Sequence, residues 1–216
     1  MSDLEKKPSL RISPYVYGRT AVRNRVTYLI DPKGEGTKMG VSETVVLTRW
    51  RQRDFANYRF SGAKLSQTFW RAVAAYYGKN ALIICKLSKE ELEDLKKTQG
   101  PAFKKLHHFD LPSSNILFVL FNICGPVRIK VLIDKHTSKE HEGRSGVPDL
   151  FLFATNIQTG KPSIARFVVV KKPREPASQD QKDEIELLNS MGLNARVMRL
   201  VEMQKKDTLR YAQRDT

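Results

Sequence analysis

The stretch Gly146-Val147-Pro148-Asp149-Leu150 opens the part of the chain whose pattern is easiest to interpret. It leads into an apolar, aromatic-rich run over residues 150–155, and a β-branched run covers residues 164–171. Runs of this length and composition are typical of strands. A polar segment with a glycine, residues 158–161, joins them as a turn. The sequence therefore predicts a hairpin that begins directly after the Pro-Asp pair.

A helix and one more strand are expected after this hairpin. Ser178 and Gln181 have the spacing of a capping box, which predicts a helix through about Met191. Gly192 then stands where glycine is favoured after a helix, and residues 195–201 read as a last strand. The fold class is therefore α/β, with a mixed sheet flanked by helices.

The preceding residues give weaker patterns. A capping box, Ser88-Lys89-Glu90-Glu91, predicts a helix through about Lys97, before Gly100-Pro101. Another helix is expected at residues 63–77, and a polar loop at residues 135–146. β-branched and apolar runs predict strands at residues 15–17, 25–30, 43–49, 80–87, 115–124 and 127–134. We expect a basic N-terminal region over residues 1–112, a core over residues 113–205 and a charged tail over residues 206–216.

The charge of the chain points to a polyanionic partner. Lys and Arg total 38 against 23 Asp and Glu, a net charge of +15 that is spread along the whole sequence. Nucleic acid is the expected partner for such an excess. A protein partner or a second copy of the chain stays open.

Cysteine content and hydropathy bound the class of protein. Two cysteines, Cys85 and Cys124, exclude a disulfide framework or a four-cysteine zinc site, and both are expected in the core. No apolar run follows the charged first residues, and the longest, residues 116–124, is too short to span a bilayer. We therefore expect a soluble intracellular protein without a membrane partner, in the cytoplasm or the nucleus.

The order of motifs in the last third of the chain resembles one nuclease family. Gly146-x-Pro148-Asp149-Leu150, a hairpin ending at Lys171, Ser178-x-x-Gln181 and Gly192 are similar to the virus-type replication-repair nuclease (VRR-NUC) domain. This is a branch of the PD-(D/E)xK nuclease superfamily, and the resemblance covers roughly residues 127–202. It implies a nuclease core that works with Mg²⁺ or Mn²⁺ on DNA, and the basic N-terminal half leaves RNA open.

The resemblance also implies roles for particular side chains. Asp149 matches the metal-binding Asp of the family, and Lys171 matches the Lys that positions water or stabilises charge. Val169 stands where the family has its Glu, so one carboxylate is missing. The carbonyl of Val170 is still available as a ligand, because side-chain identity does not affect it.

Another acid could replace the missing one. Glu184 follows Lys171 with the K-x12-E spacing of some restriction enzymes, which makes it a candidate catalytic and metal-binding residue. Gln181 matches a family position that orients the site, and the alternative is that it only caps the helix. Other candidate acids, from an upstream helix or the loop before the Pro-Asp pair, are Glu43, Glu90, Glu91, Glu93, Glu140 and Glu142.

A second group of residues is suited to contact nucleic acid. Arginines alternate with aromatic residues around residues 49–60, as a surface for phosphates and bases requires. The alternative is that the aromatic side chains are core. The candidates are Arg49, Trp50, Arg51, Arg53, Arg59, Arg144 and Lys172.

Three functions fit these observations. The first is a metal-dependent nuclease. The second is a catalytically degenerate nuclease fold that binds DNA or RNA, or a partner protein, without cutting. The third is an assembly protein whose basic surface meets RNA or an acidic partner.

Overall fold

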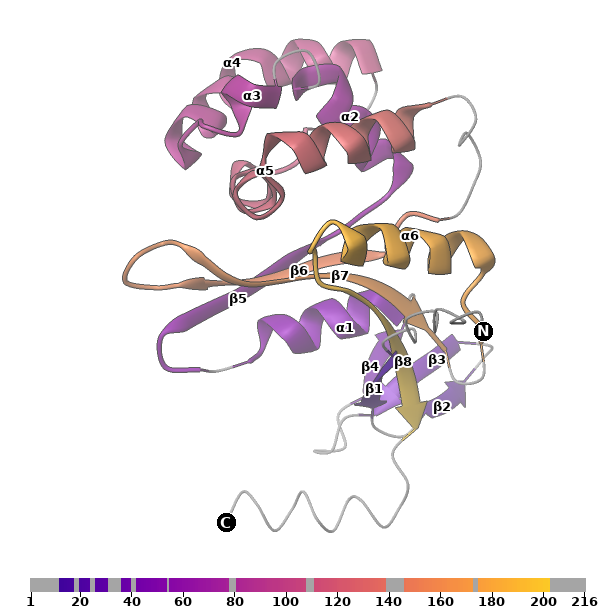
Figure 1. Cartoon of the computed structure of the whole chain (residues 1–216). Coiled ribbons are helices and arrows are strands. Elements are labelled where there is room, and N and C mark those ends of the chain that lie inside the picture. Colours follow the sequence, from indigo (N-terminus) through magenta and orange to yellow (C-terminus); the bar gives the residue numbers. More distant parts are fainter. Residues whose placement is uncertain are drawn as a thin grey trace, which may run out of the picture.

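A five-stranded mixed sheet organises the chain in the computed structural model (Figure 1). The structure describes residues 12–17, 20–23, 26–30, 36–39, 42–53, 55–77, 81–107, 111–138, 146–172 and 175–202. The sheet has the order β1-β8-β7-β6-β5, in which β8 pairs in parallel with β1 and β7, and β6 pairs antiparallel with β7 and β5. Its strands are β1 (Ile12–Tyr17), β5 (Tyr58–Lys64), β6 (Leu150–Asn156), β7 (Pro162–Lys171) and β8 (Ala195–Glu202).

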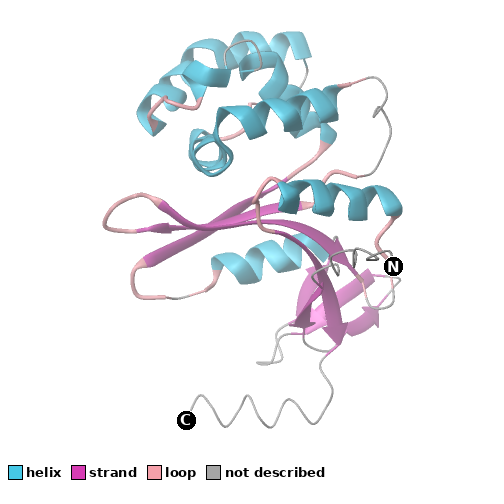
Figure 2. Ribbon diagram, viewed as in Figure 1, coloured by secondary structure: helices cyan, strands magenta, loops and turns pink. Residues whose placement is uncertain are grey.

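Helices cover both faces of this sheet (Figure 2). Helix α1 (Ser42–Arg51) packs on one face, against the side chains of Leu150, Leu152 and Val168. The opposite face, with Phe151, Phe153 and Val169, packs against α2, α5 and α6. These helices are α2 (Gln67–Tyr77), α5 (Ser114–Thr137) and α6 (Gln179–Ser190). The remaining elements are α3 (Ala81–Ile84), α4 (Lys89–His107) and a separate three-stranded sheet of β2 (Thr20–Arg23), β3 (Val26–Ile30) and β4 (Gly36–Met39).

The C-terminal part of the sequence prediction is confirmed. β6 and β7 form the expected hairpin, with Leu150 opposite Val168. Ser178 and Gln181 make both hydrogen bonds of the capping box at the start of α6, and Gly192 has a φ of +75° just after its end. The predicted α/β class with a mixed sheet is therefore correct.

The prediction of two strands at residues 115–124 and 127–134 is wrong, because both runs belong to α5. The first run is apolar throughout, and such a run does not distinguish a strand from a buried helix. In the second run the buried residues Ile129, Leu132 and His136 are spaced three and four apart, which is a helical period. Ser113 caps the helix by accepting a hydrogen bond from the backbone N–H of Ile116.

Four further predictions upstream are corrected. Residues 43–49 lie in α1, a helix whose buried side chains Val46 and Trp50 are four residues apart. Residues 80–87, expected as a strand, contain the short helix α3, and residues 63–66 precede α2 instead of joining it. The helix that begins at the Ser88 capping box runs past Pro101 to His107, because Leu92 and Phe103 bury one face of it three turns apart.

The division of the chain at residue 112 stays a prediction. The five-stranded sheet takes β1 and β5 from before this point and β6, β7 and β8 from after it. The predicted tail, residues 206–216, lies outside the described residues.

Helix α5 is long and apolar enough to cross a membrane, as judged by its length and composition alone. In this structure it packs against α2, α3, α4 and β7, and its side chains Leu117, Leu120 and Leu132 have no exposed surface. Cys124 is buried in the same helix and Cys85 packs against the same core, as predicted.

A glycine with a special backbone conformation kinks α5. Gly125 has φ +68° and ψ 172°, a conformation that is essentially restricted to glycine. Pro126 follows it and fits the start of the second helical segment. Gly125 therefore divides α5 into two helical segments.

Replacing Gly125 by alanine should destabilise the fold by about 1–3 kcal/mol, because alanine disfavours this backbone conformation. The added Cβ would have no steric clash, since no atom lies within 4 Å of it. Gly100→Ala is the matched control, since Gly100 lies in α4 and its added Cβ would meet nothing closer than 3.8 Å. That variant should be stabilised by about 0.5–1 kcal/mol. Urea unfolding measures both, and equal effects would contradict the strained kink.

Candidate functional site

Asp149 lies where β5, β6 and β7 meet at one end of the sheet. Its Oδ2 accepts a hydrogen bond of 2.6 Å from the backbone N–H of Val170, and its carbonyl accepts one of 2.8 Å from the N–H of Leu65. The donor of the first bond is Val170, the residue before Lys171 on β7, so the pairing of β6 with β7 orients the carboxylate. The predicted Asp149 and Lys171 therefore belong to one site.

The electrostatics of Asp149 are those of a crowded carboxyl group. Burial raises the pKa of Asp149 to about 6, the Val170 N–H and the charge of Lys171 oppose this rise, and the carboxylates of Glu43 and Glu175 add to it. Three acids, one from α1, one before β6 and one after β7, are therefore close enough to act on one another. Near neutral pH such a group gains from a cation.

Lys171 is held in this site by Glu175. Its Nζ donates to Oε1 of Glu175 at 3.1 Å, and its side chain is 11% exposed. Oε2 of Glu175 accepts from the backbone N–H of Lys172 at 3.1 Å, so both carboxylate oxygens are used by the end of β7. Sequence reasoning missed Glu175, although its position four residues after Lys171 was a possible signal.

Val169 cannot take the part of the missing acid. Its side chain has no exposed surface and packs in the core with Phe167 and Ile185. The acids whose charges act on Asp149 come instead from outside the strand, from Glu43 and Glu175.

Among the upstream candidates, the structure brings Glu43 to Asp149. Glu43 lies in the first turn of α1, and its Oε2 is buried without a hydrogen-bond partner among the described residues. The other three upstream candidates lie on α4, where Glu91 caps the helix at Ser88 and Glu93 accepts from the Ser114 hydroxyl. Glu140 and Glu142 lie outside the described residues.

The carboxylates of Asp149 and Glu43 are suited to a hard divalent cation. Mg²⁺ is commonly held by one or two carboxylates, with waters and substrate phosphates completing its shell. The orphaned, buried oxygen of Glu43 fits such a partner. Within the described ranges, no group of three or more His, Cys, Asp or Glu side chains is placed to hold a metal ion.

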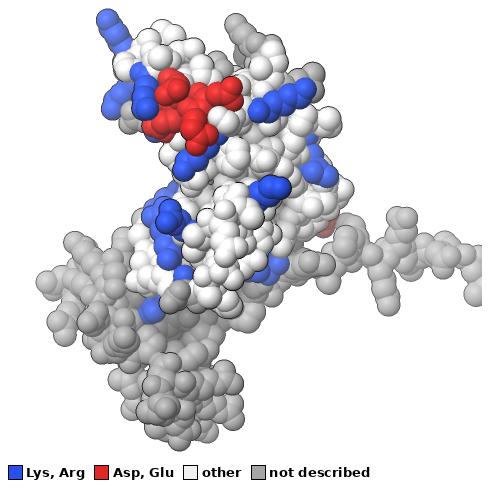
Figure 3. All heavy atoms as spheres, turned by 90° about the vertical axis from the view of Figure 1, so that its left-hand side faces the viewer, with Lys and Arg blue, Asp and Glu red and all other residues white. Residues whose placement is uncertain are grey.

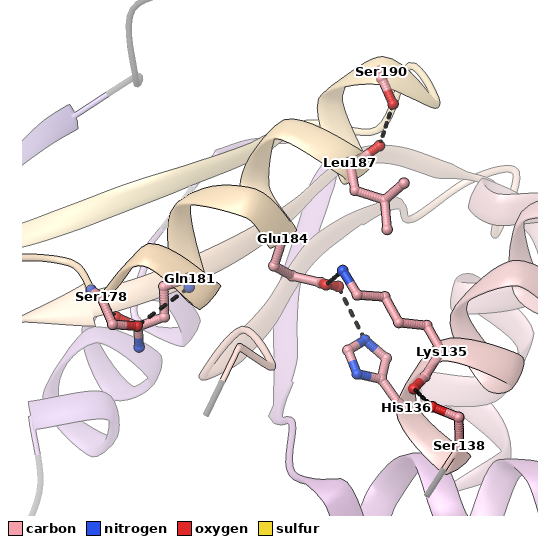
Figure 4. Close-up of polar contacts among 8 residues, drawn as sticks. All are labelled: Lys135, His136, Ser138, Ser178, Gln181, Glu184, Leu187 and Ser190. Carbon is pink, nitrogen blue, oxygen red and sulfur yellow. Dashed lines mark hydrogen bonds and ion pairs between the residues drawn. The ribbon is translucent and has the colours of Figure 1, made fainter. Parts of the chain in front are cut away.

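Glu184 is occupied by two other partners (Figure 4). Its side chain is 1% exposed, and it accepts from Lys135 Nζ at 2.6 Å and from His136 Nε2 at 3.0 Å. Among the described residues, the charges that act on Asp149 are those of Glu43, Lys171 and Glu175, and Glu184 is not one of them. The prediction that Glu184 supplies a metal ligand beside Asp149 therefore gains no support from this geometry, because Lys135 and His136 already neutralise it.

A small cavity of about 90 Å³ lies beside this ion pair. Lys135, His136 and Glu184 line it together with Asp180 and Asp183 of α6, Gln67 of α2, and Gly146 and Val147. His136, expected in a loop, lies in α5 and stacks on Trp70 with the rings 5.2 Å apart. This arrangement fixes α6 against α5.

Gln181 acts as the cap of α6 in this structure (Figure 4). Its Oε1 accepts from the backbone N–H of Ser178 at 3.1 Å, and its own N–H donates to the Ser178 hydroxyl at 3.3 Å. The capping role of Gln181 is therefore confirmed. An additional role in orienting the site stays a prediction.

The predicted nucleic-acid contacts divide into exposed and buried residues. Arg51, Arg53, Arg59 and Lys172 are exposed and Arg49 is half-buried. Trp50 is 2% exposed and donates to the Phe153 carbonyl at 3.0 Å, so its prediction as a base-stacking residue is wrong and the core alternative is correct. Arg144 lies outside the described residues.

Charge is distributed unevenly on the side of the molecule drawn in Figure 3. Acidic side chains gather in one cluster near the top, over α4, whereas Lys and Arg lie around this cluster and are scattered below it towards the sheet. The exposed acids of α4 are Glu90, Glu91 and Asp94.

The raised pKa of Asp149 predicts a stability gain for Asp149→Asn. The native state binds a proton more tightly than the unfolded chain, so stability falls as pH rises through about 6. Asparagine removes this cost and should be more stable by about 1–3 kcal/mol near pH 8, with the gap closing near pH 4. Urea unfolding at both pH values measures it.

Asp180→Asn is the control for this measurement. Asp180 is exposed in the first turn of α6, where the helix dipole favours an anion, so its replacement should stabilise nothing near pH 8. A pH-independent effect of Asp149→Asn would contradict a buried, crowded carboxyl group.

Glu184→Gln should destabilise the fold by about 1–3 kcal/mol at neutral pH, because Lys135 and His136 lose a buried partner. Burial alone would raise the pKa of Glu184. The hydrogen bonds and charges of His136 and Lys135 outweigh this effect and hold the pKa below its usual range. The stabilisation is therefore lost as pH falls through that lowered pKa, and the two proteins should converge in acid. Thermal unfolding against pH tests this, with the exposed Glu186→Gln as control.

Comparison with known proteins gives one family model and several solved structures of similar fold. Residues 122–202 match the family model of the VRR-NUC domain. No curated protein sequence matches the chain. Similar solved structures include crystal structures of paFAN1 bound to 5′-flap DNA with a gap, with flaps of 2 nt and 1 nt.

Both paFAN1 structures share the fold at 9% sequence identity, with TM-scores of 0.55 and 0.56. They cover 94% and 93% of this chain, and the chain covers 40% and 39% of theirs. The chain thus spans about two fifths of the length of these relatives. The resemblance predicted from Pro148-Asp149, Lys171 and Ser178-x-x-Gln181 is confirmed, and residues 122–202 carry the VRR-NUC nuclease fold.

Proposed function

We propose that the chain binds nucleic acid and hydrolyses its phosphodiester bonds with a divalent cation, at the site of Glu43, Asp149 and Lys171. One observation carries this proposal: the partly buried Asp149 feels the charges of Lys171 and of Glu43, whose Oε2 is buried without a hydrogen-bond partner among the described residues. A divalent cation would relieve the repulsion between the two acids, and the match of residues 122–202 to the VRR-NUC family model supports a nuclease site at Asp149.

The side chains divide the chemistry between them. Asp149 and Glu43 would hold Mg²⁺ or Mn²⁺ through their carboxylate oxygens. When bound, the cation supplies positive charge beside the phosphoryl group and lowers the pKa of a water molecule. Lys171, held by Glu175, stabilises the negative charge that develops on the phosphoryl oxygens.

DNA is the first substrate to test. The paFAN1 structures contain 5′-flap DNA, and the net charge of +15 suits any nucleic-acid backbone. The substrate set therefore includes single-stranded, duplex and flap DNA, together with single-stranded RNA.

A nuclease fold that binds without cutting is the second candidate. Its support is Val169, whose buried apolar side chain fills the family position of the second acid. In that case the basic surface binds nucleic acid and the remaining acids bind no metal.

Cleavage in Mn²⁺ should be abolished by Asp149→Asn and reduced at least about a hundredfold by Lys171→Met, since each removes a group that contacts the reacting centre. Wild-type cleavage should fall below pH 6, because Asp149 then takes up a proton and loses its affinity for the cation. Labelled substrates on denaturing gels give the rates. Asp180→Asn, in a different element, should cut like the wild type.

Thermal unfolding with and without Mn²⁺ provides a readout that is independent of cleavage. Mn²⁺ should raise the melting temperature of the wild type and not that of Asp149→Asn. Salt-sensitive binding without cutting and without a Mn²⁺ shift would contradict the nuclease and establish the binding module.

A further inference from the structure

Two guanidinium groups share one buried aromatic ring at the C-terminal end of α1. The Cζ of Arg53 lies 4.6 Å from the centroid of the Trp50 ring, and the Cζ of Arg166 lies 5.4 Å from it. The ring itself is fixed by the hydrogen bond to the Phe153 carbonyl and by an edge contact with Phe60. The two arginines therefore lie no more than 10.0 Å apart, the sum of the two distances.

Arg196 joins them from the neighbouring strand. Arg196 is paired with Val168, two residues after Arg166 on β7, so both arginines point to the face covered by α1. Burial lowers the pKa of Arg166, and the charges of Arg196 and Arg53 lower it further. Arg53 after α1, Arg166 on β7 and Arg196 on β8 thus bring three positive charges together.

The described residues provide no carboxylate to balance this cluster at Arg166. Its Nε is buried and has no hydrogen-bond partner among them. The guanidinium of Arg196 donates to the amide oxygen of Asn194 at 2.8 and 3.3 Å, which orients it. Clustered cations that are partly withdrawn from water are costly unless an anion meets them.

The cluster is distinct from the Asp149 site but connected to it by two elements. Arg166 lies four residues before Val170 on β7, or about 13 Å along the strand. Trp50 lies seven residues after Glu43 on α1, or about 10 Å along the helix. Three or four base steps of a DNA strand, at about 3.4 Å each, span this separation.

We propose that Arg53, Arg166 and Arg196 bind a backbone phosphate of the nucleic acid, a few nucleotides from the bond at Asp149. Guanidinium groups suit this ligand because each can donate two parallel hydrogen bonds to phosphate oxygens. The fixed Trp50 ring holds two of them in place before binding. This inference rests on the proposed function only in taking nucleic acid as the ligand, and it requires neither metal nor cleavage.

Binding of fluorescently labelled duplex and flap DNA in EDTA tests the phosphate site. Arg53→Gln and Arg166→Gln should each weaken binding about tenfold, and each should reduce the slope of log K against log salt by about 0.9. Lys105→Gln removes one exposed charge from α4 and is the matched control, with an expected change within about twofold.

Two further variants keep the outcome interpretable. Arg166→Lys retains the charge, so it should recover the salt slope but only part of the affinity, because a lysine does not donate the paired hydrogen bonds. Asp180→Asn, which alters an exposed residue of α6, should bind DNA in EDTA within about twofold of the wild type. Arg53 is exposed, so its replacement leaves the core intact and thermal unfolding checks this.

The possible results separate this inference from the proposed nuclease. Arginine variants that bind with the affinity and salt slope of Lys105→Gln would overturn the phosphate site, even if Asp149→Asn abolishes cleavage. Loss of binding in the arginine variants, with no cleavage by the wild type, would support the phosphate site and contradict the nuclease. Free inorganic phosphate that competes equally against wild type and Arg53→Gln would also overturn it.

Discussion

Burial of the β6–β7 hairpin on both faces is the constraint on which the rest of the structure depends. Phe151 and Phe153 face α5 and α6, while Leu150 and Leu152 face α1. A strand pair that is apolar on both faces must be covered twice, and this recruits helices from both ends of the chain. Asp149 stands directly before this hairpin, so the same burial places it at the rim of the core, where a carboxyl group has a raised pKa.

Helix α1 connects the two charged features of the molecule. Its first turn carries Glu43 to the acids around Asp149, and its other end carries Trp50 to the arginine cluster. The helix dipole alone would favour this polarity, since acids suit the N-terminus and bases the C-terminus. The like charges within each group also repel one another. We therefore assign a cation to the acidic group and a phosphate to the arginine cluster.

Local signals in the sequence predicted the C-terminal elements well. The Ser178–Gln181 capping box, Gly192 and the turn around Gly160 each depend on a few adjacent residues, so their geometry follows from local chemistry. Helix α5 was missed because its first half is apolar all round and its second half begins with a short alternation. Glu43 could not be selected among the upstream acids, because only the packing of α1 on the sheet brings it to Asp149. Glu175 was missed because it follows the strand and lies outside the expected motif.

Val169 shows how a site can change while its fold persists. The strand position of the family Glu is occupied by a core side chain, and the negative charges that act on Asp149 come instead from Glu43 and Glu175. Anomalous diffraction from crystals grown with Mn²⁺ tests this account most directly. It predicts a peak between the carboxylates of Asp149 and Glu43 that is lost in Asp149→Asn, and a peak at Asp180 and Asp183 alone, or none, would contradict it.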